Sequence, residues 1–258
     1  MKAIFISVRT GSTRLPQKAL IEIKGRKTIE YLIDRVKRSQ YAEDIVLCTT
    51  TLEEDDILCD VAHKNNIKCF RGSAPDKLKR WEGAAKEHNV DFFVNADGDD
   101  IFFDHGLADI CFKQYDNSSR KLDFIDGRGL YNDVYGIKTS ALTEVCSFKK
   151  DTETEFIRPY FIETEKFITQ GIQNVPEKYK KKNIRMTLDY QDDLSFFKTI
   201  IKHCLENKID MSFENILSFI EENPYIVDIN WHCEQSWIDN QDKMINRIME
   251  KNFDKKSK

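Results

Sequence analysis

Three cations lie close together in a polar segment near the start of the chain. Arg9, Arg14 and Lys18 surround a stretch of small residues that includes Gly11. Small residues let backbone N–H groups close on an anion, and the cations supply the opposite charge. The segment follows an apolar run typical of a buried strand, and ligands of open α/β sheets bind beyond the carboxyl ends of strands. We therefore expect residues 9–18, the cationic loop, to bind phosphates, although a solvated turn is the alternative.

The loop differs from two common phosphate-binding motifs. It lacks the Gly-Lys-Ser/Thr ending of a Walker loop. It has only Gly11 where a dinucleotide fingerprint needs three glycines. The number of its cations instead suits a triphosphate.

Carboxylates gather at the ends of two further predicted strands. Residues 97–100, the acidic turn, read Asp-Gly-Asp-Asp, and Asp189 ends a later strand. Crowded carboxylates repel each other, and a divalent cation such as Mg²⁺ relieves that repulsion. Asp97 and Asp189 are therefore the candidate metal ligands, against the alternative that the turn only caps the next helix. Asp193 is expected to stabilise the start of a helix as an N-terminal acid.

The cationic loop resembles the opening motif of cytidylyltransferases that make CMP-activated sugar acids, particularly the SpsF-like branch. That family usually reads Ala-Arg-x-Gly-Ser-x-Arg-Leu-Pro-Gly-Lys. In this chain Val8 stands where alanine is usual, and Gln17 replaces the second glycine. Neither departure removes a charge.

Three later stretches match the same family in the same order. Ala96 and Asp97, followed by Asp104, match its metal-binding aspartate region, and Asp189 matches its Asp-Thr-Pro-Glu-Asp-Leu segment. Residues 70–73, followed by Asp76, match an Arg-Gly-Ser segment that leads into a nucleotide-contacting helix. The order and spacing of all four stretches, over residues 1–200, are more specific than any one of them.

The resemblance implies a Mg²⁺-dependent reaction of CTP with a small anionic acceptor, which gives a CMP-linked product and pyrophosphate. It assigns catalysis to Arg9, Lys18, Asp97 and Asp189, with the two aspartates as metal ligands. The implied nucleotide-binding residues are Val8, Arg9, Thr10, Gly11, Ser12, Arg14, Lys18, Arg71, Asp76 and Ala96. Positioning and electrostatic stabilisation dominate such transfers, so no protein nucleophile is needed.

The acceptor segments depart from the family pattern. Tyr135 replaces the glutamate of an Asp-Val-Glu segment, and Phe156 replaces the histidine of an Arg-Glu-His-Val-Thr-Pro segment. The candidate acceptor-binding residues are Tyr135, Glu155 and Arg158. The sequence does not decide whether the acceptor is a sugar acid, such as Kdo or a nonulosonic acid, or a related phosphate or phosphonate.

Two other functions compete with nucleotidyl transfer. Asp97-Gly98-Asp99 is an Asp-x-Asp motif, as in metal-dependent GT-A glycosyltransferases. A non-catalytic relative that binds nucleotide is the other alternative. The Arg-Leu-Pro-x-Lys loop favours nucleotidyl transfer over glycosyl transfer, and the presence of Lys18, Asp97 and Asp189 together favours an enzyme.

Strands and helices alternate along the chain, which predicts an α/β fold with a mostly parallel sheet covered on both faces. The resemblance implies a Rossmann-like three-layer sandwich of the nucleotide-diphospho-sugar transferase, GT-A-like type. The expected strands cover residues 1–8, 44–50, 68–72, 91–97, 123–126, 135–138 and 184–189. The expected helices cover residues 28–36, 55–64, 76–88, 107–115, 139–148, 192–207, 213–221 and 239–250.

Composition bounds the remaining possibilities. The 258 residues predict one domain, 1–258, with residues 226–258 as a partly helical C-terminal extension whose end, 251–258, is frayed. A net charge of −4 argues against a general nucleic-acid binder, and no apolar stretch is long enough for a membrane helix. We expect a cytoplasmic protein.

Cysteine and tryptophan give further expectations. The seven cysteines, scattered and without a Cys-x-x-Cys pair, are expected to be buried free thiols, and the five histidines show no metal-ligand spacing. Trp231 and Trp237 either form a homodimer contact or pack the C-terminal segment against the core.

Overall fold

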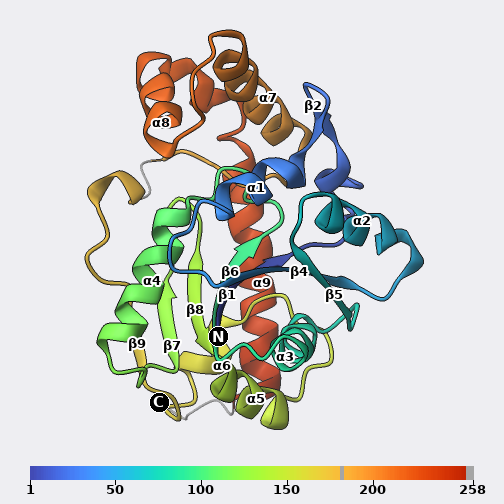
Figure 1. Ribbon diagram of the computed structural model, residues 1–258, viewed down its shortest axis with the longest axis vertical. Coiled ribbons are helices and arrows are strands. Elements are labelled where there is room, and N and C mark those ends of the chain that lie inside the picture. The colour runs from blue at the N-terminus through green and yellow to red at the C-terminus, as the bar shows by residue number, and fades with distance from the viewer. Residues whose placement is uncertain (181–182, 254–258) are drawn as a thin grey trace.

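A seven-stranded sheet forms the centre of the computed structural model, which describes residues 1–180 and 183–253. Its strand order is β5-β4-β1-β6-β8-β7-β9 (Figure 1), and only β8 runs against the others. The strands are β1 (Lys2–Ser7), β4 (Asp44–Thr50), β5 (Lys68–Gly72), β6 (Phe92–Asp97), β7 (Phe124–Gly127), β8 (Val134–Lys138) and β9 (Thr169–Gly171). A separate hairpin pairs β2 (Glu22–Ile23) with β3 (Arg26–Lys27). The expected α/β fold with a mostly parallel sheet is thus confirmed.

Helices cover both faces of the sheet, because its strands bury side chains on both sides. In β1, Ile4 and Ile6 join one apolar core, whereas Ala3 and Phe5 join the other. The α-helices are α1 (Thr28–Val36), α2 (Asp56–Lys64), α3 (Lys77–Glu87), α4 (His105–Asn117), α5 (Thr139–Phe148), α6 (Arg158–Ile162), α7 (Gln191–Glu206), α8 (Phe213–Glu222) and α9 (Cys233–Asn252). The 3₁₀ helices are η1 (Lys18–Leu20), η2 (Glu53–Asp55), η3 (Glu177–Tyr179) and η4 (Pro224–Ile229). The first core includes residues of α1, α2, α4, α7 and α8, and the second includes residues of α3, α5 and α6.

The chain changes direction across the sheet next to β1. After β1 it builds β4 and β5 on one side and then returns to place β6 on the other side. Ser7 and Asp97 are register partners at the carboxyl ends of β1 and β6. Loops that leave a switch point of this kind separate and open a crevice, which is where α/β sheets bind ligands.

The local structure differs from the sequence-based expectation at four points. Residues 184–189 form no strand, because their backbone does not pair with a strand of the sheet. The Leu188 N–H instead donates to the Asp99 carbonyl in the acidic turn (3.0 Å). Strand β9 was not expected, since its three residues give too short a pattern to detect. Helix α9 begins at Cys233, six residues before the expected start at Asp239.

The fourth correction concerns the cysteines. Cys59 of α2 and Cys69 of β5 form a disulfide, although their spacing gave no sign of it. The other five cysteines are buried free thiols, as expected. The pairing depends on α2 packing against β5, which separation along the chain does not reveal.

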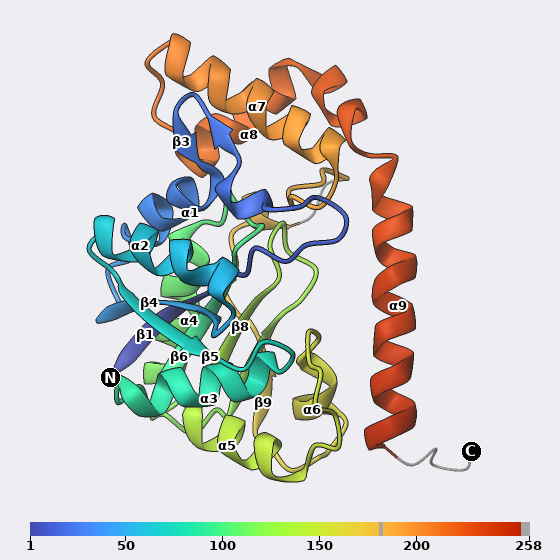
Figure 2. The same cartoon turned by 90° about the vertical axis from the view of Figure 1, so that its right-hand side faces the viewer.

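Helix α9 runs beside the body of the molecule from α7 at one end to α6 at the other (Figures 1 and 2). Its start is anchored by Glu234, whose carboxylate accepts a hydrogen bond from Arg185 (3.0 Å). Its end is anchored at Asp151, which pairs with Lys251 (2.8 Å) and accepts a hydrogen bond from Asn252. Most residues between these anchors are exposed or only partly buried. Residues 254–258, most of the expected frayed end, lie outside the described part of the chain.

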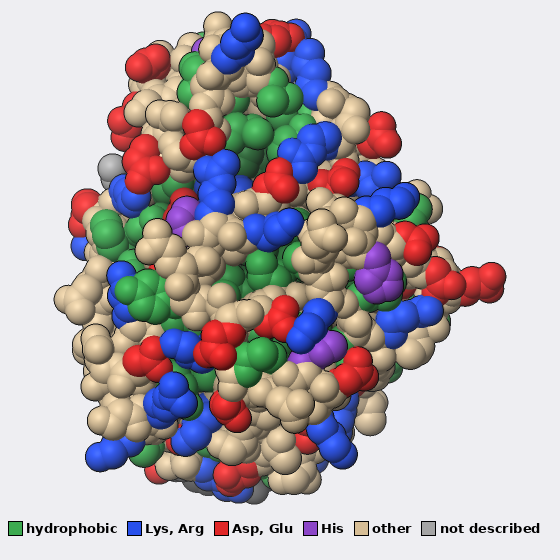
Figure 3. All heavy atoms as spheres, viewed as in Figure 1, with side chains coloured by type: hydrophobic (Ala, Val, Ile, Leu, Met, Phe, Trp, Pro, Cys, Tyr) green, Lys and Arg blue, Asp and Glu red, His purple; other side chains and the backbone are tan. Residues whose placement is uncertain are grey.

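Charges of both signs mix on the molecular surface. On the face in Figure 3, Lys and Arg side chains are interspersed with Asp and Glu, and apolar side chains show between them. Within residues 1–180 and 183–253, no helix is both long and apolar enough to cross a membrane.

Candidate functional site

A cavity of about 730 Å³ opens beyond the carboxyl ends of β1 and β6. The cationic loop and the acidic turn contribute to its wall, as do residues 128–133, 154–159 and the inner side of α9. The cavity lining includes the predicted site residues Val8, Arg9, Gly11, Ser12, Arg14, Lys18, Asp97, Tyr135, Glu155, Arg158 and Asp189. Most of the residues singled out in the sequence therefore meet in one place.

Lys18 links the acidic turn to Asp189. Its ammonium group lies 2.7 Å from Asp99 Oδ2 and 2.9 Å from Asp189 Oδ1. Arg14 contacts the same Asp189 oxygen at 2.6 Å. Segments separated by more than 170 residues thus meet through opposite charges.

Burial and charge act against each other at this junction. Burial alone would lower the pKa of Lys18, but the Asp99 and Asp189 carboxylates outweigh it and raise the pKa. For Asp189, burial favours the neutral acid, yet Lys18 and Arg14 lower its pKa. Asp99 has a raised pKa, because burial and the nearby Asp189 and Asp97 carboxylates exceed the effect of Lys18. The Asp99 and Asp189 carboxylates therefore form one electrostatic cluster with Lys18 and Arg14.

Asp97 has its own cation. The Lys77 ammonium lies 2.5 Å from Asp97 Oδ1 and 4.8 Å from the centre of the buried Trp81 ring. A lysine at a helix start gives no signal of its own, so Lys77 is not among the predicted site residues. Asp99, expected only as part of the acidic turn and of an Asp-x-Asp motif, pairs with Lys18.

Two backbone positions bring the loops together. A Cβ on Gly98 would lie 2.7 Å from the Val8 side chain, so only glycine lets the acidic turn approach β1 this closely. Gln17 adopts a left-handed conformation with φ of 54°. This is the position at which the resembling family has glycine, so the loop keeps the glycine geometry despite the substitution.

Four predicted nucleotide-binding residues do not line the cavity. Thr10 donates from its N–H and hydroxyl to Asp55 (2.7 and 2.6 Å), and Ala96 is buried in the sheet. Arg71 donates to backbone carbonyls of residues 50 and 52 (2.9 and 2.8 Å). Asp76 caps α3. These contacts give the four residues a structural role and do not place them against a ligand in this cavity.

Asp104 likewise has a structural place. It caps α4 through the Gly106 N–H (2.7 Å) and accepts a hydrogen bond from Tyr179 (2.9 Å). It also pairs with Arg35 (3.4 Å). The match of Asp104 to a metal-binding region therefore does not extend to this site.

The predicted acceptor residues lie on the side of the cavity formed by β8, α6 and the segment before α6. Arg9 pairs with Glu155, which joins the cationic loop to this side. Arg158 donates from Nε to Asp126 (2.7 Å). The Tyr135 backbone N–H donates to the Asn95 side-chain oxygen (2.7 Å). Burial and the nearby Asp133 carboxylate raise the pKa of the Tyr135 phenol. The side chain is thus a neutral hydrogen-bonding group.

Arg80 and helix α9 also line the cavity. Arg80 is 5% exposed, and its Nε has no hydrogen-bond partner in the described part of the chain. Helix α9 adds Trp237, Gln241 and a set of apolar side chains. The helix was expected to begin only at Asp239, so its contribution to this wall could not be foreseen.

The donor set fits a hard divalent cation. Asp97, Asp99 and Asp189 interact electrostatically and offer only oxygen ligands, which Mg²⁺ prefers. Burial, together with the nearby Asp189 and Asp97 carboxylates, raises the pKa of Asp99, and a bound divalent cation would favour its charged form. Asp193 is excluded from this set, because its carboxylate caps α7 by accepting hydrogen bonds from the Asp189 and Tyr190 N–H groups (2.8 and 2.9 Å).

Comparison with known proteins places this site in context. A family model described as "Cytidylyltransferase" matches residues 3–211. The protein MJ1063 of Methanocaldococcus jannaschii is 29% identical over 91% of this chain and 97% of its own length. The spore coat polysaccharide biosynthesis protein SpsF of Bacillus subtilis is 23% identical over 85% of this chain and 93% of its own. A cytidylyltransferase structure from Leptospira borgpetersenii aligns with a TM-score of 0.78 and 27% identity, covering 88% of this chain and 96% of the other.

Proposed function

This chain belongs to the cytidylyltransferase family, and from that premise we propose that it is a Mg²⁺-dependent enzyme that transfers CMP from CTP to a small anionic acceptor. An acceptor oxygen attacks the α-phosphorus, the bond from that phosphorus to the bridging oxygen of the β-phosphate breaks, and pyrophosphate leaves. One observation carries the proposal: Lys18 and Arg14 of the cationic loop pair with Asp99 and Asp189 inside a single cavity.

Charge exchange explains how this cavity suits a metal-bound triphosphate. The cations of the cationic loop and the carboxylates pair with each other. A ligand that brings both an anion and a divalent cation offers each set a new partner. After the exchange, every buried charge again has a partner of opposite sign. Leaving one buried ion without a partner would cost several kcal/mol, as an order of magnitude.

The chain's own residues have distinct roles in this reaction. Arg9, Arg14 and Lys18 hold the triphosphate and stabilise the charge that develops on the leaving pyrophosphate. Asp97, Asp99 and Asp189 would hold Mg²⁺. When bound, Mg²⁺ supplies Lewis-acid stabilisation of negative charge on phosphate oxygens. Lys77 positions Asp97 through the 2.5 Å contact.

The acceptor side favours an anion with hydrogen-bonding groups. Arg158 and Arg128 supply positive charge there, and the neutral Tyr135 replaces the carboxylate usual in the resembling branch. We infer a sugar acid or a related phosphate or phosphonate as the acceptor, used in the biosynthesis of a surface polysaccharide or glycoconjugate. The similarity to SpsF supports that biosynthetic setting.

Pyrophosphate release tests the proposal directly. The protein is incubated with Mg²⁺, each of the four nucleoside triphosphates and a panel of Kdo, nonulosonic acids, sugar phosphates and phosphonates. Release is expected with CTP and one class of acceptor. If CTP and Mg²⁺ raise the melting temperature but no pair reacts, the chain is a nucleotide-binding protein or uses another acceptor. If CTP neither reacts nor shifts melting, the proposal is wrong.

Variants of the carboxylates test the metal assignment. Asp97→Asn and Asp189→Asn should abolish turnover while circular dichroism stays native. The matched control is Asp210→Asn, which alters an aspartate that pairs with Arg38 away from the cavity (3.1 Å). Full activity in both cavity variants would contradict the assignment.

A further inference from the structure

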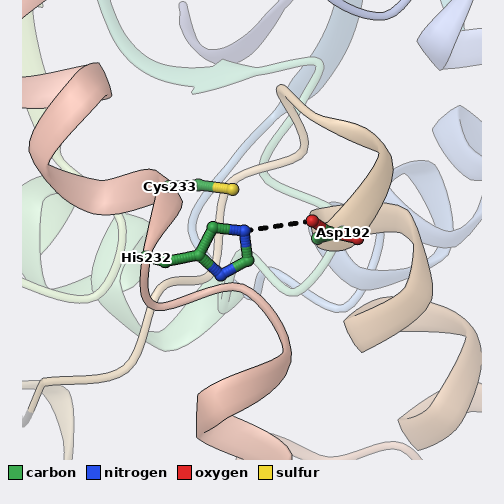
Figure 4. Close-up of side chains that lie close together, drawn as sticks. All are labelled: Asp192, His232 and Cys233. Atoms are coloured by element: carbon green, nitrogen blue, oxygen red, sulfur yellow. Dashed lines mark hydrogen bonds and ion pairs between the residues drawn. The ribbon is translucent and has the colours of Figure 1, made fainter.

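We propose that Asp192, His232 and Cys233 form a Zn²⁺ site that joins the starts of α7 and α9. The three side chains converge from two segments, and Figure 4 shows the His232 ring directed at Asp192, with the Cys233 sulfur beside the ring. Their ligand atoms all lie within 4.8 Å of one another, and His232 Nε2 lies 3.1 Å from Asp192 Oδ2. A small shift of these side chains would place all three atoms around one ion.

The chemistry of the three ligands selects the metal. One sulfur, one nitrogen and one oxygen form the mixed donor set that Zn²⁺ accepts, whereas Mg²⁺ takes oxygen ligands. Asp192 and His232 are exposed, and Cys233 is buried. A fourth position thus faces solvent and can take water, as in zinc sites with three protein ligands. This site differs in both chemistry and location from the carboxylate cluster of the cavity.

The charges of the site balance. A thiolate and a carboxylate together neutralise a divalent cation, and imidazole binds it as a neutral ligand. Asp192 lies in the first turn of α7, and Cys233 is the first residue of α9. The N-terminus of α7 favours the anionic form of Asp192, whereas burial raises the pKa of the Cys233 thiol, so metal binding has to displace the thiol proton.

A bound ion would strengthen the link between α7 and α9 that Arg185 makes through Asp193 and Glu234. Without it, the exposed contact between His232 and Asp192 links these residues, and exposed ion pairs contribute little, about 0–1 kcal/mol. Trp237, four residues after Cys233, lines the cavity. A stronger link at the start of α9 would therefore hold one cavity wall in place. The separation of 40 residues between Asp192 and His232 hides the site from any search for ligand spacing in the sequence.

Cobalt spectroscopy tests this site independently of any enzymatic activity. Chelator-treated full-length protein is titrated with Co²⁺ in excess Mg²⁺, because Co²⁺ takes the geometry of Zn²⁺ and absorbs visible light. We expect one equivalent to bind with a thiolate-to-metal charge-transfer band, and Zn²⁺ to displace it. Cys233→Ser should abolish the band, and Asp192→Asn and His232→Gln should each weaken binding by about tenfold or more.

Matched controls separate the site from other thiols and histidines. Cys146→Ser removes a buried thiol of α5, and His63→Gln removes an exposed histidine of α2; both should bind Co²⁺ as the unaltered protein does. Zn²⁺ should also slow amide hydrogen exchange in residues 232–237 of the unaltered protein but not of His232→Gln. Binding without a thiolate band, or with equal affinity in all three site variants, would overturn the proposal.

Discussion

At the scale of single residues, Lys18 decides how charge is arranged in the cavity. Its ammonium group touches both Asp99 and Asp189, and it is only 15% exposed. Charge-assisted hydrogen bonds in partly buried sites contribute about 1.5–3 kcal/mol. Lys18 can therefore exchange carboxylate partners for phosphate oxygens at little net cost, whereas a neutral side chain cannot.

We predict that Lys18→Ala weakens CTP binding by about tenfold or more, because one charge-assisted contact of this strength is lost. Isothermal titration with CTP and Mg²⁺ measures the effect. Lys24→Ala is the control, since Lys24 pairs with Glu206 on the surface and does not line the cavity. An unchanged CTP affinity in Lys18→Ala would place the triphosphate elsewhere.

At the scale of elements, Asp55 connects the cationic loop to the end of β4. Its buried carboxylate accepts hydrogen bonds from the Thr10 N–H, the Thr10 hydroxyl and the Thr50 hydroxyl. Burial alone would raise the pKa of Asp55, but these hydrogen bonds outweigh burial and lower it. The charged form of Asp55 thus holds the loop against the sheet.

We predict that Asp55→Asn lowers the free energy of unfolding at pH 7 by about 2 kcal/mol. Because the folded-state pKa of Asp55 is lowered, its contribution is present above the unfolded pKa of about 3.9 and is lost as pH falls through the folded value. Urea unfolding from pH 7 down to pH 3 should show the difference between the two proteins shrinking with acid.

The neighbouring Asp56 provides the control for this prediction. Asp56 is exposed and pairs with Arg71 on the surface, so Asp56→Asn should cost less than about 1 kcal/mol at every pH. A gap between Asp55→Asn and the unaltered protein that stays constant with pH would contradict the role assigned to the Asp55 charge.

At the scale of the whole molecule, Arg185 joins three parts of the chain. Its guanidinium is fully buried and donates to Asp193 of α7 (2.8 Å), to Glu234 of α9 (3.0 Å) and to Asp189 (3.4 Å). The same group lies 5.5 Å from the Trp237 ring. Removing one member of a buried ion network leaves the others uncompensated, which is more costly than losing a surface pair.

We predict that Arg185→Met destabilises the protein by about 3–5 kcal/mol. Chemical denaturation followed by circular dichroism measures the loss, and limited proteolysis should cut near the start of α9. Arg247→Met is the control, because Arg247 is exposed on α9 and pairs only distantly with Glu153 (3.7 Å). Equal stability of the two variants would show that the network does not anchor α9.

The cytoplasmic location and the homodimer considered from the sequence remain predictions.

Six of the seven strands of the sheet, and most of the predicted site residues that line the cavity, could be found from sequence, because their signals are local. Apolar runs predicted β1, β4, β5 and β6, and the spacing of apolar residues predicted α1 and α7. The start of α9 could not be predicted, because residues 233–238 make fewer than two helical turns and show no clear apolar repeat. Residues 184–189 have the apolar pattern of a strand, and their apolar side chains are buried in the first core. Their backbone, however, does not form hydrogen bonds with a strand of the sheet.

The sequence by itself determined the class of fold and most of the charged residues that meet beyond the strands. Residue type and order carry that information, since a strand followed by a polar loop can be recognised within about ten residues. Only the tertiary structure decided the partners. It paired Lys18 with Asp99, gave Asp104 and Arg71 structural contacts, joined Cys59 to Cys69 and brought Asp192 to His232. These outcomes depend on distances between segments far apart in the chain, which packing of the two cores against the sheet fixes and local sequence does not encode.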